Sequence, residues 1–215
     1  MKRLTFILVL FALPAGILAQ DPLRFTDEIG KMTASDTVVD RQNLIVFTGS
    51  SSIKGWWNLS DNFPGHNVIN RGFGGSDMSD LLHYVQPLIL HYTPNKVFIY
   101  EGDNDLNRGK SPQDVLKTAK QVLRKIRKGS PETEVIFISV KPSLARWKLK
   151  DQYQQYNQGL QRLAGKKNVA FVDVWTPMLN ERGEPMEDIF VEDGLHMNAK
   201  GYAIWTAAIK PFVDH

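Results

Sequence analysis

Residues 44–53 read Leu-Ile-Val-Phe-Thr-Gly-Ser-Ser-Ser-Ile, an apolar run that ends directly in a serine-rich turn. A short apolar run of this kind, closed by a glycine, predicts a strand that is buried on both faces. The turn then places Ser51 at the mouth of a sheet, as a candidate nucleophile. Three segments downstream carry groups that a serine nucleophile needs: 72–75 (Gly-Phe-Gly-Gly), 102–105 (Gly-Asp-Asn-Asp) and 193–196 (Asp-Gly-Leu-His).

Four more short apolar runs follow, and helical patterns separate them. With the first run they predict five parallel strands, at 44–47, 68–70, 97–100, 135–139 and 169–172. The clearest helix signal is Ser111-Pro112, a cap residue before a proline at the first helical position, with Gly129 as the stop. Similar patterns predict helices over about 77–92, with a bend at Pro87, and over about 150–164 and 198–209. The alternation predicts an α/β fold, a three-layer α/β/α sandwich around a five-stranded parallel sheet.

The N-terminus has the pattern of an export signal. Lys2 and Arg3 precede an apolar run over 4–13, followed by Pro14 and by a small residue at Ala19. The run is short of the ~20 residues that a membrane helix needs. We therefore expect a signal peptide over residues 1–19 and a single domain over 20–215. The mature protein is predicted to be secreted or periplasmic, without stable membrane insertion after cleavage.

Composition narrows the class of function. Without Lys2 and Arg3, 24 of the 26 basic residues remain against 23 acidic ones, so no charge excess indicates a nucleic-acid partner. The basic stretch 124–128 fits the solvated end of a helix. The chain has no cysteine, which excludes disulfides, thiolate metal sites and a cysteine nucleophile. The sequence does not indicate an oligomeric state.

The candidate residues fit acyl transfer in kind and in position. Loops after parallel strands share one edge of the sheet, so the four segments are expected to converge there. A serine hydroxyl needs a base, which His196 would supply, and Asp193 can orient the imidazole from the same loop. Gly75 allows the backbone to approach a developing oxyanion, and Asn104 offers a side-chain amide. Together they predict ester hydrolysis through an acyl-enzyme.

The four segments also resemble, in order and context, the four blocks of SGNH hydrolases, the GDSL esterase/lipase superfamily. Gly49-Ser50-Ser51, Gly75, Gly102-x-Asn104 and Asp193-x-x-His196 carry the resemblance, which covers nearly all of the mature chain. It implies a flavodoxin-like SGNH hydrolase fold and a triad of Ser51, Asp193 and His196. It also implies an oxyanion hole formed by Ser51, Gly75 and Asn104. Two positions depart from the family: Ser50 replaces the aspartate of the name motif, and Ser52 replaces a leucine or isoleucine.

Other functions are weighed against this one. A phosphate-binding loop at 72–75 would need a glycine where Asp77 stands. A calcium loop through Asp103, Asp105, Asn107 and Asp114 would need its turn glycine at position 108, which is an arginine. We therefore predict no metal and no cofactor. A non-catalytic carbohydrate-binding relative of the hydrolase fold stays open as the alternative from another class.

The substrate is the least determined part. Four aromatic residues in or near the catalytic loops are candidate substrate contacts, although such residues serve equally often in a core: Trp56, Trp57, Phe73 and Trp147. No insertion long enough for a lipase lid is present. The working hypothesis is a small-molecule or carbohydrate ester, in particular an O-acetylated polysaccharide. The alternative is a lysophospholipase, thioesterase or general short-chain acylhydrolase.

Overall fold

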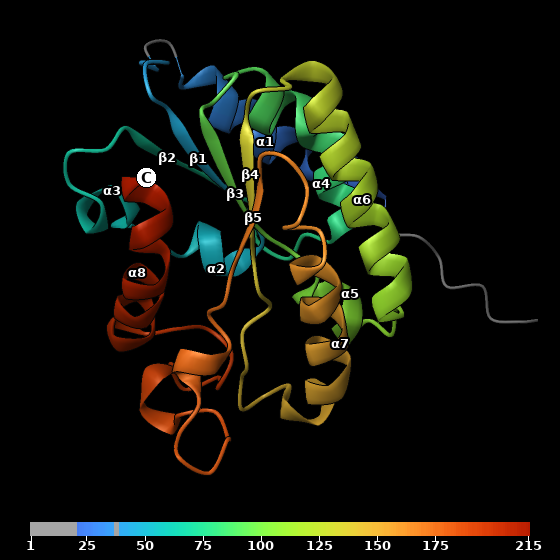
Figure 1. Cartoon of the computed structure of the whole chain (residues 1–215), viewed down its shortest axis with the longest axis vertical. Helices are drawn as coiled ribbons and strands as arrows, with labels where there is room; N and C mark the ends of the chain where they lie inside the picture. Colours follow the sequence, from blue (N-terminus) through green and yellow to red (C-terminus); the bar gives the residue numbers. More distant parts are fainter. Residues whose placement is uncertain (1–20, 37–38) are drawn as a thin grey trace, which may run out of the picture.

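The computed structural model describes residues 21–36 and 39–215, which form a twisted parallel sheet with helices on both faces (Figure 1). The strands are β1 (Ile45–Gly49), β2 (Val68–Gly72), β3 (Lys96–Tyr100), β4 (Glu134–Ile138) and β5 (Val169–Val172). They pair in parallel in the order β2-β1-β3-β4-β5. The predicted α/β/α sandwich with five parallel strands is confirmed, and the predicted strand bounds differ by no more than two residues.

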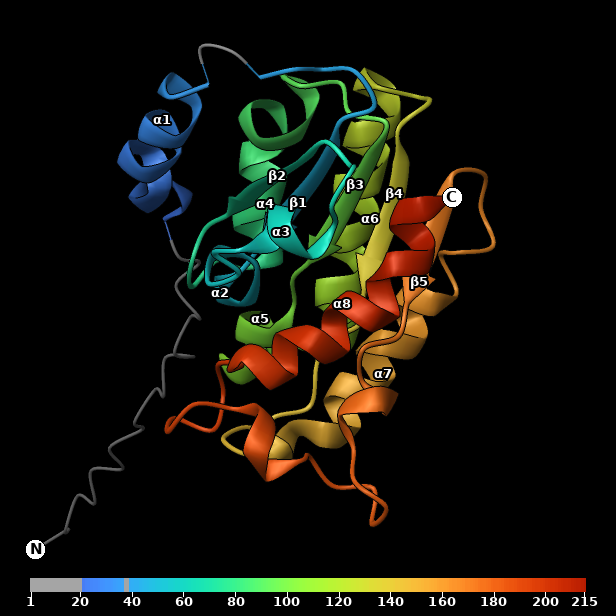
Figure 2. The ribbon, with the colours of Figure 1, turned by 90° about the vertical axis from the view of Figure 1, so that its left-hand side faces the viewer.

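Two apolar layers cover the sheet. On one face pack α1 (Thr26–Ala34), α4 (Met78–Val85), α6 (Pro112–Gly129) and α7 (Lys150–Gln161). On the other face pack α2 (Ser51–Lys54), α3 (Leu59–Asn62) and α8 (Ala199–Asp214), and Figure 2 shows α8 in front of the sheet. A last short helix, α5 (Asp103–Asn107), follows β3 at the carboxyl edge. Burial on both faces explains why the strands consist almost entirely of apolar residues.

The helix ends follow from the local sequence. The hydroxyl of Ser111 accepts a hydrogen bond from the Asp114 amide at 3.1 Å, and α6 begins at Pro112 and ends at Gly129, as predicted. The helix predicted over 77–92 divides into α4 and a π-helical turn over Gln86–Leu90. Pro87 has no N–H to donate, and the turn closes through the His91 amide and the Gln86 carbonyl at 2.8 Å. Pro87 thus lies in the π-helical turn, and the predicted bend stays a prediction.

The strand order places a crevice at the carboxyl edge of the sheet. β1 lies between β2 and β3, so the chain leaves neighbouring strands β1 and β3 toward opposite faces. Ligands of open α/β sheets bind at this topological switch point. No helix in the described part of the chain is long and apolar enough to cross a membrane. The predicted signal peptide lies outside the described residues and stays a prediction.

Candidate active site

Of the three consecutive serines in the turn after β1, only Ser51 has its side chain open to the crevice. Gly49 ends β1 at φ +133°, and a Cβ there would lie 2.0 Å from the Tyr100 carbonyl oxygen, so only glycine fits. The next residue, Ser50, is 2% exposed and donates its amide to that same carbonyl at 3.1 Å. Ser52 is 3% exposed, whereas Ser51 is half-buried at the first position of α2. The side chain that the turn presents to the crevice is therefore that of Ser51.

The loop before α8 brings an imidazole and a carboxylate to this serine. His196 Nε2 lies 3.0 Å from Ser51 Oγ, and His196 Nδ1 lies 2.5 Å from Asp193 Oδ2. The other carboxylate oxygen, Asp193 Oδ1, accepts the backbone amides of Leu195 and His196 at 2.8 Å each. The Asp193 carboxylate thus stabilises the conformation of its own loop with one oxygen and is hydrogen-bonded to the His196 imidazole with the other. The three residues predicted for a triad lie in a hydrogen-bonded chain.

These hydrogen bonds set the charge state of Asp193. Desolvation alone raises the pKa of its carboxyl group, but the bonds from the His196 side chain and from the two backbone amides outweigh it. The pKa of Asp193 is lowered to about 2. The group is therefore a carboxylate at neutral pH and can stabilise a protonated imidazole beside it.

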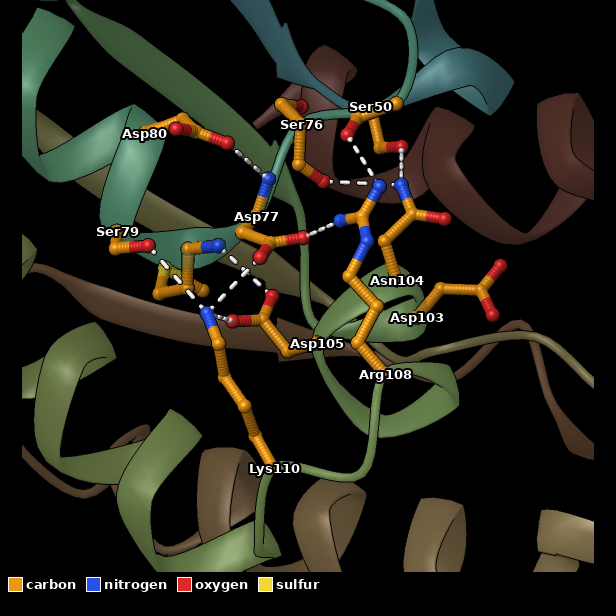
Figure 3. Close-up of polar contacts among 12 residues, drawn as sticks. Ser50, Ser76, Asp77, Ser79, Asp80, Asp103, Asn104, Asp105, Arg108 and Lys110 are labelled. Carbon is orange, nitrogen blue, oxygen red and sulfur yellow. Dashed lines mark hydrogen bonds and ion pairs between the residues drawn. The ribbon is translucent and has the colours of Figure 1, made fainter. Parts of the chain in front are cut away.

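Asn104 reaches the same turn from α5. Its Nδ2 donates to Ser50 Oγ at 2.7 Å and to the Ser76 carbonyl at 2.9 Å, and Figure 3 shows the amide pointing at Ser50. A Cβ built on Gly74 would lie 3.9 Å from Ser51 Cβ, so the glycine loop is also close to the serine. The four segments predicted to converge do so.

Gly75 has the conformation of an open turn, at φ +81° with no atom near the position of a Cβ. Its carbonyl accepts Arg108 Nη2 at 3.2 Å. Within the described residues, neither the Gly75 amide nor the Ser51 amide donates a backbone hydrogen bond. Both donors are thus available to a ligand, and their role in an oxyanion hole stays a prediction.

The comparison with family models agrees with this geometry. Residues 40–204, most of the chain, match the GDSL-like lipase/acylhydrolase family. The chain belongs to this family. It is accordingly a hydrolase that acts on ester bonds. No curated protein matches it significantly.

Several solved structures share the fold. A GDSL-like lipase of Bacteroides thetaiotaomicron is 22% identical with a TM-score of 0.71, covering 90% of this chain and 97% of that one. A Streptococcus pneumoniae protein described as a candidate platelet activating factor is 22% identical with a TM-score of 0.77, over 88% and 91%. An acetylxylan esterase of Geobacillus stearothermophilus is 14% identical with a TM-score of 0.64, over 80% and 94%. At these identities the likeness establishes the fold alone.

The candidate aromatic contacts of this GDSL-like acylhydrolase divide into core and surface. Trp56 is 0% exposed and stacks on Tyr202, and Phe73 is equally buried against Phe25, so both are corrected from candidate contacts to core residues. Trp147 stacks on Trp175 and packs against the core. Trp57, in contrast, is 87% exposed. It is the one of the four that can meet a substrate freely.

A cluster of charges around two buried aspartates lies beside the site, and the sequence did not indicate it. Lys110 Nζ bonds Asp77 Oδ2 at 2.9 Å and Asp105 Oδ1 at 2.7 Å, and Arg108 also pairs with Asp77 (Figure 3). The Asp105 Oδ2 atom accepts the Met78 amide at 2.8 Å. These bonds tie α5 to the start of α4. Of the aspartates that a calcium loop would have used, Asp103 and Asp105 are paired with basic side chains. The described residues hold no metal-binding group of three or more acidic or histidine side chains.

Glu101 is buried near these aspartates and has no ion pair with a basic side chain among the described residues. Burial raises the pKa of Glu101 well above its usual range, although Ser76 Oγ donates to its Oε1 atom, and the nearby aspartates raise the pKa further. Its Oε2 atom has no partner among the described residues. The surroundings of this side chain therefore favour its protonated form over the carboxylate. A lone Glu after a strand carries no sequence signal of this state.

Proposed function

We propose that the protein is an exported serine esterase in which Ser51 is the nucleophile, His196 the general base and Asp193 its partner. The observation that carries the proposal is the chain of two hydrogen bonds from Ser51 Oγ through His196 to Asp193. Such a relay removes the serine proton as the carbonyl is attacked. Among the described residues, Asp193 has no ion pair with a lysine or arginine that would compete with its bond to His196.

The reaction divides into two balanced steps. Ser51 Oγ attacks the carbonyl carbon while His196 Nε2 takes the hydroxyl proton, which gives a tetrahedral oxyanion. Collapse of this intermediate breaks the ester C–O bond, and the alcohol leaves with the proton from His196. Water then attacks the acyl-serine by the same route and releases the carboxylic acid. No cofactor takes part in either step.

Asn104 would stabilise the oxyanion together with the amides of Ser51 and Gly75. In the substrate-free enzyme both hydrogens of its Nδ2 atom are bonded, to Ser50 and to Ser76. Ser50 Oγ is a neutral acceptor, whereas the oxyanion is charged, and hydrogen bonds to a charged acceptor are roughly twice as strong. We expect the hydrogen that bonds Ser50 to turn to the oxyanion as it forms.

For the substrate we propose an O-acetylated carbohydrate. Trp57 borders a groove of about 300 Å³ together with Gly55, Asn58, Met197 and Tyr202. Gly55 follows the helix that begins at Ser51, and Met197 follows His196, so the groove borders the two segments that carry the nucleophile and the base. An exposed indole face suits stacking on a sugar ring. An acetylxylan esterase is among the proteins that share the fold.

Acyl-chain profiling tests this substrate class. We expect the purified mature protein to prefer p-nitrophenyl acetate over longer esters and to release acetate from acetylated xylan. Trp57→Ala should raise KM on the polymer about fivefold or more and leave p-nitrophenyl acetate unaffected, while Trp57→Phe, which keeps an aromatic face, should stay close to the native enzyme. A preference for acyl chains of about eight carbons or more would favour the lysophospholipase or thioesterase alternative.

A further inference from the structure

Arg146 links the loop that follows β4 to the amide of Asn104. Its Nη1 atom lies 2.6 Å from Asp103 Oδ1 and 3.2 Å from Asn104 Oδ1. The side chain is 14% exposed, so solvent screens these contacts little. Neither the family blocks nor the candidate triad includes this arginine.

We propose that Arg146 is a positioning residue for the oxyanion donor, acting through the amide of Asn104. A guanidinium group has only donors, so the atom of Asn104 that faces it must be the oxygen. The Ser76 carbonyl only accepts, so the atom of Asn104 on that side must be the nitrogen. Contacts on both sides thus fix the amide in the orientation that points its N–H groups toward the serine turn.

The positive charge adds to this orientation. A cation at the amide oxygen draws electron density from the nitrogen and strengthens the N–H groups as donors, as in other hydrogen-bond chains that polarise one another. Donors held in place before the reaction need no reorganisation when the oxyanion forms. Arg146 thereby prepares the charge distribution that the transition state requires.

Asp103 keeps the guanidinium in position. Burial raises the pKa of this carboxyl group, but Lys141, Arg146 and the hydroxyl of Tyr153 outweigh it and lower the pKa, so the group is ionised. The Lys141 Nζ atom lies 3.8 Å from Asp103 Oδ2, and the Tyr100 hydroxyl donates to the same oxygen at 3.2 Å. Arg146 is thus held by a carboxylate with partners on both oxygens.

The same loop also meets the other half of the site. The amide of Ala145 donates to the Gly194 carbonyl at 3.1 Å, in the loop of Asp193 and His196. A substitution at Arg146 could therefore act on either half. The test must separate an effect through Asn104 from a shift of the histidine loop.

A double-mutant cycle makes this separation, and it rests on the proposed function. The purified protein is compared with its Arg146→Met, Asn104→Ala and double variants, by hydrolysis of p-nitrophenyl acetate and by thermal unfolding. Loss of a hydrogen bond to a charged group corresponds to a fall in kcat of roughly 10- to 100-fold for Arg146→Met, with KM nearly unchanged. In the Asn104→Ala background the same change should lower kcat by less than about threefold, because its target is absent.

Two further variants complete the experiment. Arg146→Lys keeps the charge with a single donor group and should restore part of kcat, and it carries the test if Arg146→Met does not fold. Arg71→Met breaks another buried ion pair, with Asp36, and should lower stability without lowering kcat. Equal losses at Arg146 in both backgrounds would overturn the inference. If Asn104→Ala itself left kcat unchanged, the result would instead refute the proposed role of Asn104 as an oxyanion donor.

Discussion

Alanine substitutions at the three consecutive serines have different predicted effects. Ser51→Ala removes the atom that lies 3.0 Å from His196 Nε2, and kcat should fall by about 10⁴-fold or more. Ser52→Ala should leave kcat within about twofold. Its backbone carbonyl accepts a hydrogen bond from the Tyr202 hydroxyl at 3.1 Å, and the substitution leaves this backbone bond intact.

Ser50→Ala should give an intermediate result. It deletes the acceptor of the 2.7 Å bond from Asn104 and leaves one N–H of a side chain that is only 8% exposed without a partner, which costs about 1–3 kcal/mol of stability. The Ser76 carbonyl still holds the amide nitrogen, so kcat should fall by less than about tenfold. The assay is p-nitrophenyl acetate hydrolysis at saturation, with urea unfolding of each variant. An inactive Ser52→Ala beside an active Ser51→Ala would refute the assignment of Ser51.

Three more changes probe the framework. Glu101→Gln should flatten the pH dependence of stability. The raised pKa favours the protonated carboxyl in the native protein, whereas the unfolded chain ionises above the usual pKa of 4.5, so the stability of the native protein to urea falls as pH rises beyond that value. A variant with the same slope of stability against pH would contradict this. Gly49→Ala should cost roughly 2–5 kcal/mol in urea unfolding, because its Cβ overlaps the Tyr100 carbonyl, and a stability loss below 1 kcal/mol would speak against the turn. Asp193→Asn should lower kcat at pH 7 by about 10³- to 10⁴-fold. It should also remove the stability loss of the native protein as pH falls from 3.8 toward 2, and unaltered acid unfolding would contradict the lowered pKa.

The sheet and the meeting of the candidate residues were predictable because both follow from local rules. Buried strands show as apolar runs, and Ser111 before Pro112, followed by a helical apolar pattern, is a local signal of a helix start. Parallel strands bring their carboxyl ends to one edge, so residues as distant in sequence as Ser51 and His196 could be placed together.

Side-chain exposure in the loops was not predictable in the same way. Trp56 and Trp57 are neighbours in the same turn, yet one is buried and the other is open to solvent. The difference arises because α8 contributes Tyr202 and Trp205 against Trp56. Nothing in the turn itself encodes this contact, which depends on a helix about 150 residues later in the sequence.

The buried charges were missed for a related reason. Arg146 follows β4 in a loop without a motif, and its partners Asp103 and Asn104 lie about 40 residues earlier. Asp103 was considered only as a possible cation ligand. In the structure Asp103 forms ion pairs with Lys141 and Arg146, which follow β4. No spacing in the sequence indicates this pairing.

Activation of Ser51 is tested by intact-mass spectrometry of the purified protein after treatment with a fluorophosphonate, beside the Ser51→Ala variant. The reagent reports activation of a serine without knowledge of the substrate. We expect a single adduct on the native protein and none on the variant. A folded native protein that takes up no adduct, or a variant that is labelled as well, would contradict the assignment of Ser51 as an activated nucleophile.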